Sequence, residues 1–293
     1  MKIDDERNGS IGSIGFIGGG NMGEAMIGAL TRTGVFAPEA VRVADASAER
    51  LEYLRETYGI RPAANNAEAF RESDAVVLAV KPQQMDAVLG EIAGAADYRS
   101  GTGPERRKLL ISIAAGIPIA RIENLLYRSL DVAGRERLAI VRVMPNTPSL
   151  VGAGMSGMSA NRHATEADVA AARKILAAMG RVMEFREPDL DAVTGVSGSG
   201  PAYVFYLAEA MAEGGVAAGL EPSAAAELAL ATIEGAARLM RERGESPAEL
   251  RRKVTSPGGT TEAALKVMED NGVRRRIAEA IGAATRRAGE LSR

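Results

Sequence analysis

The sequence predicts an α/β fold, with a doubly wound parallel sheet in the N-terminal part and only helices in the C-terminal part. Short Val- and Ile-rich runs alternate with helical patterns from Ser13 to about Ala160, which is typical of parallel sheets covered on both faces. A glycine-rich segment directly follows the first run. Beyond Glu187 the strand pattern stops. We therefore predict two domains, residues 1–188 and 189–293.

The individual elements follow from the spacing of apolar residues and from local start and stop signals. Ser47 is the expected N-cap of the second helix and Gly59 its C-terminal glycine, while Asn66 is expected to cap the third helix. Strands are expected at residues 14–17, 41–44, 75–80, 109–114 and 139–144, with 181–185 as a candidate edge strand. Helices are expected at 22–33, 47–58, 66–72 and 84–95, and the polar segment 98–108 is expected to be a surface loop.

Composition excludes several classes of function. With 36 basic and 38 acidic residues among 293, the formal net charge is −2, so the chain lacks the basic excess of a dedicated nucleic-acid binder. The absence of cysteine excludes disulfides, cysteine-ligated metals and thiol nucleophiles. A single histidine, His163, excludes a multi-histidine metal site, and we expect it to lie at the surface. We expect no metal site.

Neither a leader nor a membrane span is expected. The charged start MKIDDERN lacks the apolar core of a signal peptide. The most apolar stretch, residues 201–220, is interrupted by Glu209 and Glu213, whereas a bilayer helix needs about 20 predominantly apolar residues. We expect this stretch to be a helix buried on most sides, either within its own domain or against a second subunit. The expected location is the cytoplasm.

The first glycine cluster has the pattern G-x-G-x-x-G, formed by Gly18, Gly20 and Gly23 with Asn21 and Met22 inside it. It follows the first predicted strand and opens the first helix, where free N–H groups and the helix dipole attract a pyrophosphate. This context predicts a Rossmann-type dinucleotide-binding loop.

Asp45 stands 22 residues after Gly23, at the end of the second predicted strand. A carboxylate there accepts a hydrogen bond from a ribose 2′-hydroxyl and repels a 2′-phosphate. Asp45 therefore favours NADH over NADPH, although Arg42 or Arg50 is near enough in sequence to serve a phosphate. The alternative is that Asp45 only caps the helix that begins near Ser47.

The next three predicted strands end in small residues and prolines, at the edge where doubly wound sheets bind ligands. We expect this edge to form a flat trough for a nicotinamide. Its candidate cofactor-binding residues are Val80, Lys81, Pro82, Ala115 and Asn146.

The chain resembles the pyrroline-5-carboxylate reductase family, which makes proline. The resemblance rests on six segments that run in the same order over the chain: IGFIGGGNMGEAM (14–26), AVKPQ (79–83), ISIAAGI (111–117), MPNTP (144–148), DAVTGVSGSGPAYVF (191–205) and TSPGGTTEAAL (255–265). It implies reduction of 1-pyrroline-5-carboxylate to L-proline with NADPH or NADH. It also implies a C-terminal domain that forms a homodimer, or a higher oligomer of dimers.

The last of these segments contains a second glycine cluster at a helix start. Consecutive backbone N–H groups freed by Gly258 and Gly259 form a nest for an anion, here a small carboxylate. The resemblance implies that Ser256, Gly259, Thr260 and Thr261 hold the substrate carboxylate. It further implies that the Thr261 hydroxyl assists at the ring nitrogen, that Asn66 contacts the adenosine ribose and that Glu187 borders the substrate pocket.

Two other functions remain as alternatives. The β-hydroxyacid dehydrogenases share a similar glycine-rich opening, but they carry a Lys after an S-G-x-G turn, and the segment from Gly198 to Val204 has none. A non-catalytic nucleotide sensor on a Rossmann scaffold is the second alternative, because a fold alone does not determine function.

Overall fold

The computed structural model describes residues 11–94 and 103–292. These residues form two compact units: the first runs up to Gly198 and also includes the C-terminal segment from Thr285, and the second is Ser199–Ala284. The start MKIDDERN and residues 98–102 of the expected surface loop lie outside the described residues. The following Gly103 and Pro104 are buried, and Lys108 already belongs to a strand.

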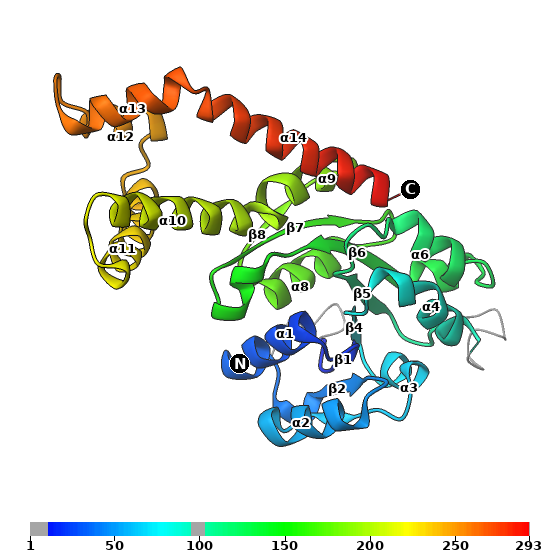
Figure 1. Ribbon diagram of the computed structural model, residues 1–293. Coiled ribbons are helices and arrows are strands. Elements are labelled where there is room, and N and C mark those ends of the chain that lie inside the picture. Colours follow the sequence, from blue (N-terminus) through cyan, green and yellow to red (C-terminus); the bar gives the residue numbers. More distant parts are fainter. Residues whose placement is uncertain (1–10, 95–102, 293) are drawn as a thin grey trace. The chain divides into compact units, whose positions relative to one another are not determined.

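The first unit is built on one eight-stranded sheet with the order β3-β2-β1-β4-β5-β6-β7-β8 (Figure 1). Its strands are parallel from β3 to β6, and β7 runs antiparallel to β6. The strands are β1 (Ile14–Ile17), β2 (Val41–Ala44), β3 (Arg61–Pro62), β4 (Ala75–Leu78), β5 (Lys108–Ser112), β6 (Leu138–Met144), β7 (Gly154–Ala160) and β8 (Gly180–Glu184).

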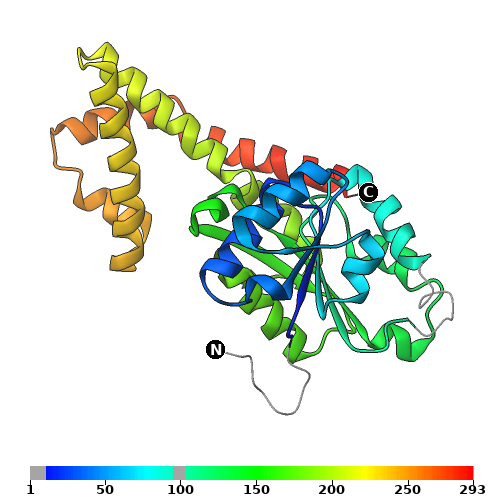
Figure 2. The same cartoon turned by 90° about the horizontal axis from the view of Figure 1, so that it is seen from below.

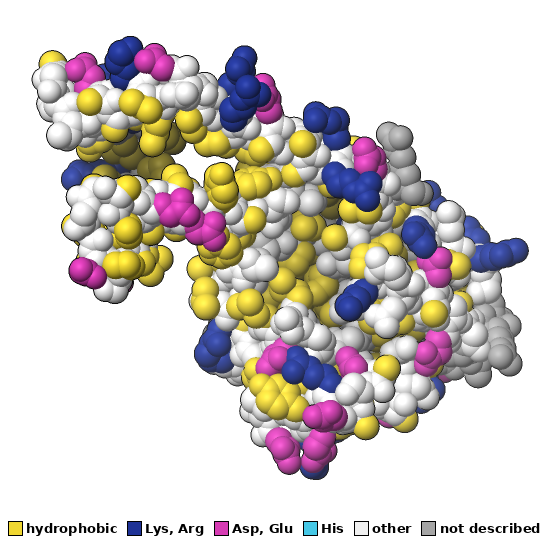
Figure 3. Space-filling view, in the orientation of Figure 1, with side chains coloured by type: hydrophobic (Ala, Val, Ile, Leu, Met, Phe, Trp, Pro, Cys, Tyr) yellow, Lys and Arg dark blue, Asp and Glu magenta, His cyan; other side chains and the backbone are white. Residues whose placement is uncertain are grey.

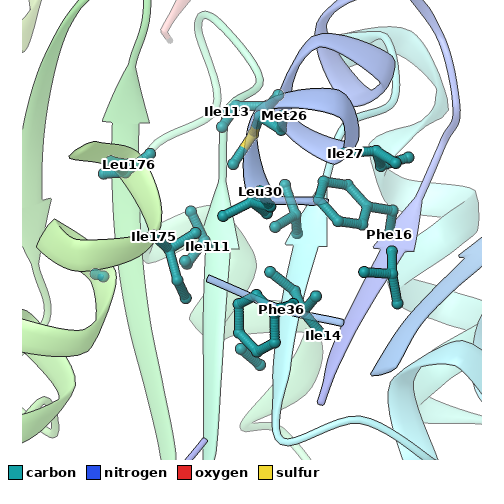
Figure 4. Close-up of a cluster of buried hydrophobic side chains, with 14 of the residues drawn as sticks. Ile14, Phe16, Met26, Ile27, Leu30, Phe36, Ile111, Ile113, Ile175 and Leu176 are labelled. Carbon is teal, nitrogen blue, oxygen red and sulfur yellow. The ribbon is translucent and has the colours of Figure 1, made fainter. Parts of the chain in front are cut away.

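Helices cover both faces of this sheet because its strands point apolar residues to both sides. Phe16 of β1 packs into the cluster with α1, α2 and α8, whereas the next residue, Ile17, packs into the cluster with α3, α4 and α6. Figure 4 shows part of the first cluster, in which Phe16 lies near Ile27 and Leu30 of α1, and Ile14 lies beside Phe36. The helices are α1 (Asn21–Arg32), α2 (Ala48–Tyr58), α3 (Asn66–Arg71), α4 (Met85–Ala93), α6 (Ile119–Leu126), α7 (Val132–Glu136), α8 (Glu166–Ala177) and α9 (Leu190–Val193).

The expected fold class is confirmed, with local corrections. The two-residue β3 and the Gly- and Ser-rich β7 were not predicted, because neither has the apolar run that signals a strand. Ser47 caps α2 by accepting from Arg50 N, and Gly59 ends this helix with φ +69°. Asn66 is not the N-cap of α3, because the neighbouring Asn65 accepts from Glu68 N instead.

The second unit contains only helices, and α10 and α11 contact each other most extensively (Figure 2). A turn through Gly219, with φ +100°, joins these two helices. The last helix, α14, begins in this unit and ends in the first. The helices are α10 (Gly200–Ala217), α11 (Pro222–Arg243), α12 (Pro247–Lys253), α13 (Thr260–Asp270) and α14 (Val273–Leu291).

The helical unit leaves most of its apolar surface uncovered in the single chain. No residue of α10 is buried, and Phe205 and Tyr206 are 62% and 75% exposed. Figure 3 shows hydrophobic side chains spread over the surface of these helices. Burial of α10 within its own domain, one of the two expectations for this stretch, is therefore wrong. Within the described residues, no helix combines the length and apolarity needed to cross a membrane.

Candidate active site

The glycine-rich loop has the shape that its sequence requires for a nucleotide. Gly18 has φ +97°, and a Cβ there would stand 2.7 Å from the carbonyl oxygen of Ala79. A Cβ at Gly23 would stand 2.6 Å from the carbonyl oxygen of Gly18, so this glycine lets α1 pack closely against the loop. Nothing lies within 4 Å of a Cβ at Gly20, the N-cap of α1. The backbone is therefore open where a pyrophosphate would approach the helix start.

Asp45 is tied to this loop. Its Oδ2 accepts from the backbone N–H of Gly19 at 2.7 Å, and its Oδ1 accepts from the N–H of Ser47 at 2.9 Å. The side chain thus serves both the loop and the start of α2, and it remains half-buried at the end of β2. Each carboxylate oxygen has more than one acceptor site, so these bonds leave capacity for a ribose hydroxyl.

Arg50 joins α2 to the same loop. Its Nε donates to the carbonyl oxygen of Gly19 at 2.6 Å, and its guanidinium forms an ion pair with Glu24 of α1. Tyr53 and Tyr58 also donate hydroxyl hydrogen bonds to Glu24, at 3.0 and 2.9 Å. Burial of Tyr58, together with its bond to the Glu24 carboxylate, raises the pKa of its hydroxyl to about 12. This cluster fixes the arginine beside the loop, and the sequence pattern alone did not reveal it.

The predicted trough residues gather at the carboxyl ends of neighbouring strands. Lys81 and Ala115 are exposed, and Val80 and Pro82 are half-buried. They follow β4 and β5, which pair in parallel, while β1 and its glycine loop lie on the other side of β4. The structure therefore brings the loop, Val80, Lys81, Pro82 and Ala115 to one edge of the sheet.

Asn146 and Asn66 already have partners within the chain. The Asn146 amide donates to the carbonyl oxygen of Ser197 at 3.2 Å, and its Oδ1 accepts from Met155 N at 2.8 Å. The Asn66 amide donates to Glu91 Oε2 at 2.7 Å. Their expected contacts with a cofactor remain predictions. To contact a cofactor, each side-chain amide would have to give up one of these hydrogen bonds or form an additional one.

Glu187 belongs to a polar cluster in the first unit. One oxygen, Oε1, accepts from Ile119 N at 2.7 Å and from Arg142 Nη1 at 3.1 Å. The Arg142 side chain is 9% exposed, and its Nη2 donates to Ser292 Oγ near the C-terminus at 3.3 Å. The cluster joins β6, the start of α6 and the end of α14. Whether Glu187 also borders a substrate pocket stays a prediction.

The second glycine cluster lies in the helical unit and forms a tight turn. Gly258 has φ +70°, and Gly259 N donates to the carbonyl oxygen of Ser256 at 3.0 Å, as in a type II turn with proline second. Gly259 is the N-cap of α13 and makes no side-chain capping bond. The helix itself leaves the N–H groups of Thr260 and Thr261 without partners. These groups and the threonine hydroxyls form the candidate carboxylate site.

His163 contributes to a structural cluster in the first unit. Its ring stands edge-on to Tyr127, and its carbonyl oxygen accepts from Arg107 at 2.6 Å. Arg107 Nε also donates to both oxygens of Asp168, which forms a capping box with Thr165 at the start of α8. Burial opposes ionisation of Asp168, but the bonds from Arg107 and Thr165 outweigh it and hold the pKa of this carboxyl below its ordinary value.

Comparisons with known proteins agree with both halves of this description. Residues 187–291 match the family model for pyrroline-5-carboxylate reductase dimerisation, and residues 13–116 match the model for NADP oxidoreductases that depend on coenzyme F420. The pyrroline-5-carboxylate reductase of Synechocystis sp. is 45% identical over 280 residues, which cover 96% of this chain and 98% of that protein. The chain belongs to the pyrroline-5-carboxylate reductase family.

Solved structures of pyrroline-5-carboxylate reductases share the whole fold. The Coxiella burnetii enzyme is 37% identical and matches with a TM-score of 0.86, over 97% of this chain and 99% of that one. The Plasmodium falciparum enzyme, solved with NADP bound, is 29% identical with a TM-score of 0.80, over 96% and 98% of the two chains. The family resemblance expected from the sequence is thereby confirmed.

Proposed function

We propose that this chain reduces 1-pyrroline-5-carboxylate to L-proline by hydride transfer from NAD(P)H. The observation that carries the proposal is the turn at residues 256–259, which leaves the first N–H groups of α13 unpaired in a chain of this family. A nucleotide loop alone would fit many oxidoreductases and a nucleotide sensor. A second set of free N–H groups that suits a small carboxylate favours, among these functions, an enzyme whose substrate carries a carboxylate.

The glycine-rich loop and the adjoining sheet edge would hold the cofactor. The open backbone at Gly20 and the start of α1 suit a pyrophosphate, and Asp45 suits an adenosine ribose. The exposed Lys81 and Ala115 suit the nicotinamide end. We further propose that the protein prefers NADH over NADPH. The negative charge of Asp45 repels a 2′-phosphate, and the nearby Arg50, which could bind that phosphate, is already paired with Glu24.

The start of α13 would bind the substrate. The carboxylate would accept hydrogen bonds from the N–H groups of Thr260 and Thr261, assisted by the Ser256 hydroxyl. The Thr261 side chain is half-buried, and among the described residues its hydroxyl has no partner. That hydroxyl would hydrogen-bond to the ring nitrogen and orient the imine.

The proposed hydride transfer needs no strong general acid or base from the protein. When bound, NAD(P)H would supply a hydride to the imine carbon (C2 of 1-pyrroline-5-carboxylate, which becomes C5 of proline), the C=N π pair would become the nitrogen lone pair, and one proton in total would complete the secondary amine. A protonated imine accepts hydride readily, so the chain contributes mainly orientation and exclusion of water. Orientation alone can lower a barrier by about 7–11 kcal/mol. This division of labour suits a chain with one histidine and no cysteine.

The helical unit would form a homodimer, and the reaction would take place in the cytoplasm. The uncovered apolar residues of α10 are the main support for the dimer, because monomers rarely expose large contiguous apolar patches. We further propose that dimerisation brings the substrate loop and the nicotinamide together. On this view the division near residue 188 separates a nucleotide-binding domain from a domain for assembly and substrate binding.

An assay with purified protein tests the proposed reaction. We expect NAD(P)H oxidation at 340 nm to depend on 1-pyrroline-5-carboxylate, with L-proline as the product, and to be negligible in the reverse assay with NAD(P)+ and 3-hydroxy acids. Equal activity with 3-hydroxy acids would favour the β-hydroxyacid dehydrogenase alternative. Nucleotide binding without turnover of any of these compounds would favour the sensor.

A further inference from the structure

The turn that precedes α13 already holds a carboxylate from its own chain. The backbone N–H of Gly258 donates to Oε2 of Glu262 at 2.7 Å. Glu262 is the third residue of α13, and its side chain reaches back past the N-cap Gly259 to make this bond. A fixed anion therefore occupies the N–H group of Gly258, two residues before the first N–H group of the proposed carboxylate site.

Glu262 shares the hollow between α12 and α13 with the basic side chains of Arg251, Arg252 and Lys266. Within the described residues, Glu262 takes part in no ion pair. Arg251 pairs with Glu269 and Lys266 with Asp270, whereas Arg252 takes part in no ion pair in the described part of the chain. The backbone N–H of Gly258 and the helix dipole stabilise the Glu262 carboxylate. The negative charge of Glu262 therefore lies at the start of α13 without an ion-pair partner among the described residues.

We infer that Glu262 tunes the substrate site by competing with the substrate carboxylate for the start of α13. The inference rests on the proposed function, because it assumes that an anionic ring compound binds there. Two negative charges at one helix start repel each other, and both draw on the same positive end of the helix dipole. Glu262 therefore weakens binding of the substrate and of other ring carboxylates, without taking part in hydride transfer.

A glutamine substitution separates charge from geometry. Glu262→Gln keeps an oxygen that can accept from Gly258 N and removes the negative charge. We expect KM for 1-pyrroline-5-carboxylate to fall by about 3- to 5-fold, the upper range for an exposed charge pair. We expect kcat and the KM for NAD(P)H to stay within about 2-fold, because transition-state contacts are untouched. Glu262→Asp keeps the charge and should leave KM within about 2-fold of wild type.

Inhibitor binding gives a readout that a purely structural cap would not move. Cyclopentanecarboxylate carries the ring and the charge, and cyclopentanecarboxamide carries the ring without the charge. Glu262→Gln should tighten inhibition by the carboxylate as much as it lowers KM, and leave inhibition by the carboxamide unchanged. Glu166→Gln is the matched control, because Glu166 is an exposed first-turn glutamate on α8. It should alter none of these values.

The outcomes separate this inference from the proposed function. If the wild-type protein reduces 1-pyrroline-5-carboxylate but Glu262→Gln leaves its KM unchanged or raises it, the inference is wrong and the proposed function stands. An equal fall of KM in Glu262→Asp would also overturn it, because the hydrogen bond rather than the charge would be responsible. If the wild-type protein does not reduce 1-pyrroline-5-carboxylate at all, the proposed function itself fails.

Discussion

Asp45 Oδ2 accepts a hydrogen bond from the backbone N–H of Gly19 across 2.7 Å, so the carboxylate proposed to bind the ribose is anchored to the glycine loop. Its other oxygen accepts from the N–H of Ser47. These bonds hold a negative charge in a fixed place beside the glycine loop. Ser47 rather than Asp45 caps α2, so the bond from Asp45 to the Ser47 N–H leaves the proposed ribose role open.

Replacement of Asp45 should change the choice of cofactor. We expect the wild type to prefer NADH over NADPH by about 10-fold or more in kcat/KM, because a fixed carboxylate repels the 2′-phosphate. Asp45→Ala should reduce that ratio. It should also raise KM for both cofactors, because the glycine loop loses the hydrogen bond from Gly19 N to Asp45. Steady-state kinetics with both cofactors measures the ratio. A clear preference of the wild type for NADPH would contradict this account of Asp45.

Two glycines of the nucleotide loop should behave differently when replaced by alanine. Gly18→Ala places a Cβ against Ala79 and forces a positive φ, so we expect unfolding to become easier by about 1–3 kcal/mol. Gly20→Ala meets open space and should leave thermal stability unchanged while it raises the Kd for NADH by about 10-fold or more, because the methyl group occupies the approach of the phosphates. Thermal melts and NADH fluorescence titrations compare them. Normal NADH binding by Gly20→Ala would place the pyrophosphate elsewhere.

Thr261→Ala tests the hydroxyl proposed for the ring nitrogen. Turnover should fall by about one to three orders of magnitude, roughly the contribution of one positioned donor. KM for NAD(P)H should hardly change, because this residue belongs to the substrate loop. Thr261→Ser restores the hydroxyl and should recover most of the activity. Unchanged turnover in Thr261→Ala would remove this residue from the mechanism.

Charge placed on α10 should break the assembly. Phe205 is 62% exposed in the single chain, and Phe205→Glu should convert the dimer into a monomer in analytical ultracentrifugation, with loss of activity. Val132→Glu is the control, because Val132 is 72% exposed but lies on α7 of the first unit. A Phe205→Glu protein that remains dimeric would show that this part of α10 is not the interface.

Acid should remove the contribution of Asp168 to stability. Its folded-state pKa is lowered, so the stabilisation is complete above the unfolded-state value of about 3.9 and disappears as pH falls through the folded-state pKa. At pH 7 we expect Asp168→Asn to lower the free energy of unfolding by about 1–3 kcal/mol. Urea unfolding at pH 7 and below pH 4 should show the two proteins converging in acid. A constant difference would assign the effect to the capping geometry rather than to charge.

The sequence was sufficient for features that depend on local pattern. Strand β1, the glycine loop and the Ser47 cap follow from neighbouring residues, and the structure places them as expected. It was insufficient where a partner lies far along the chain. The bonds of Glu187 to Ile119 and Arg142, and of Arg50 to Gly19, join segments between 31 and 68 residues apart. No local pattern encodes such contacts, and the small residues of β7 give no strand signal.

The most direct test of the central claim is a crystal structure of the protein with NADH and a five-membered ring carboxylate. The account predicts the ring acid on the N–H groups of Thr260 and Thr261, with the ring carbon that corresponds to the imine carbon of the substrate facing C4 of the nicotinamide. It would be contradicted if the carboxylate bound elsewhere while these amides hydrogen-bonded only to water, in a crystal whose subunits all hold NADH on the Gly18–Gly23 loop.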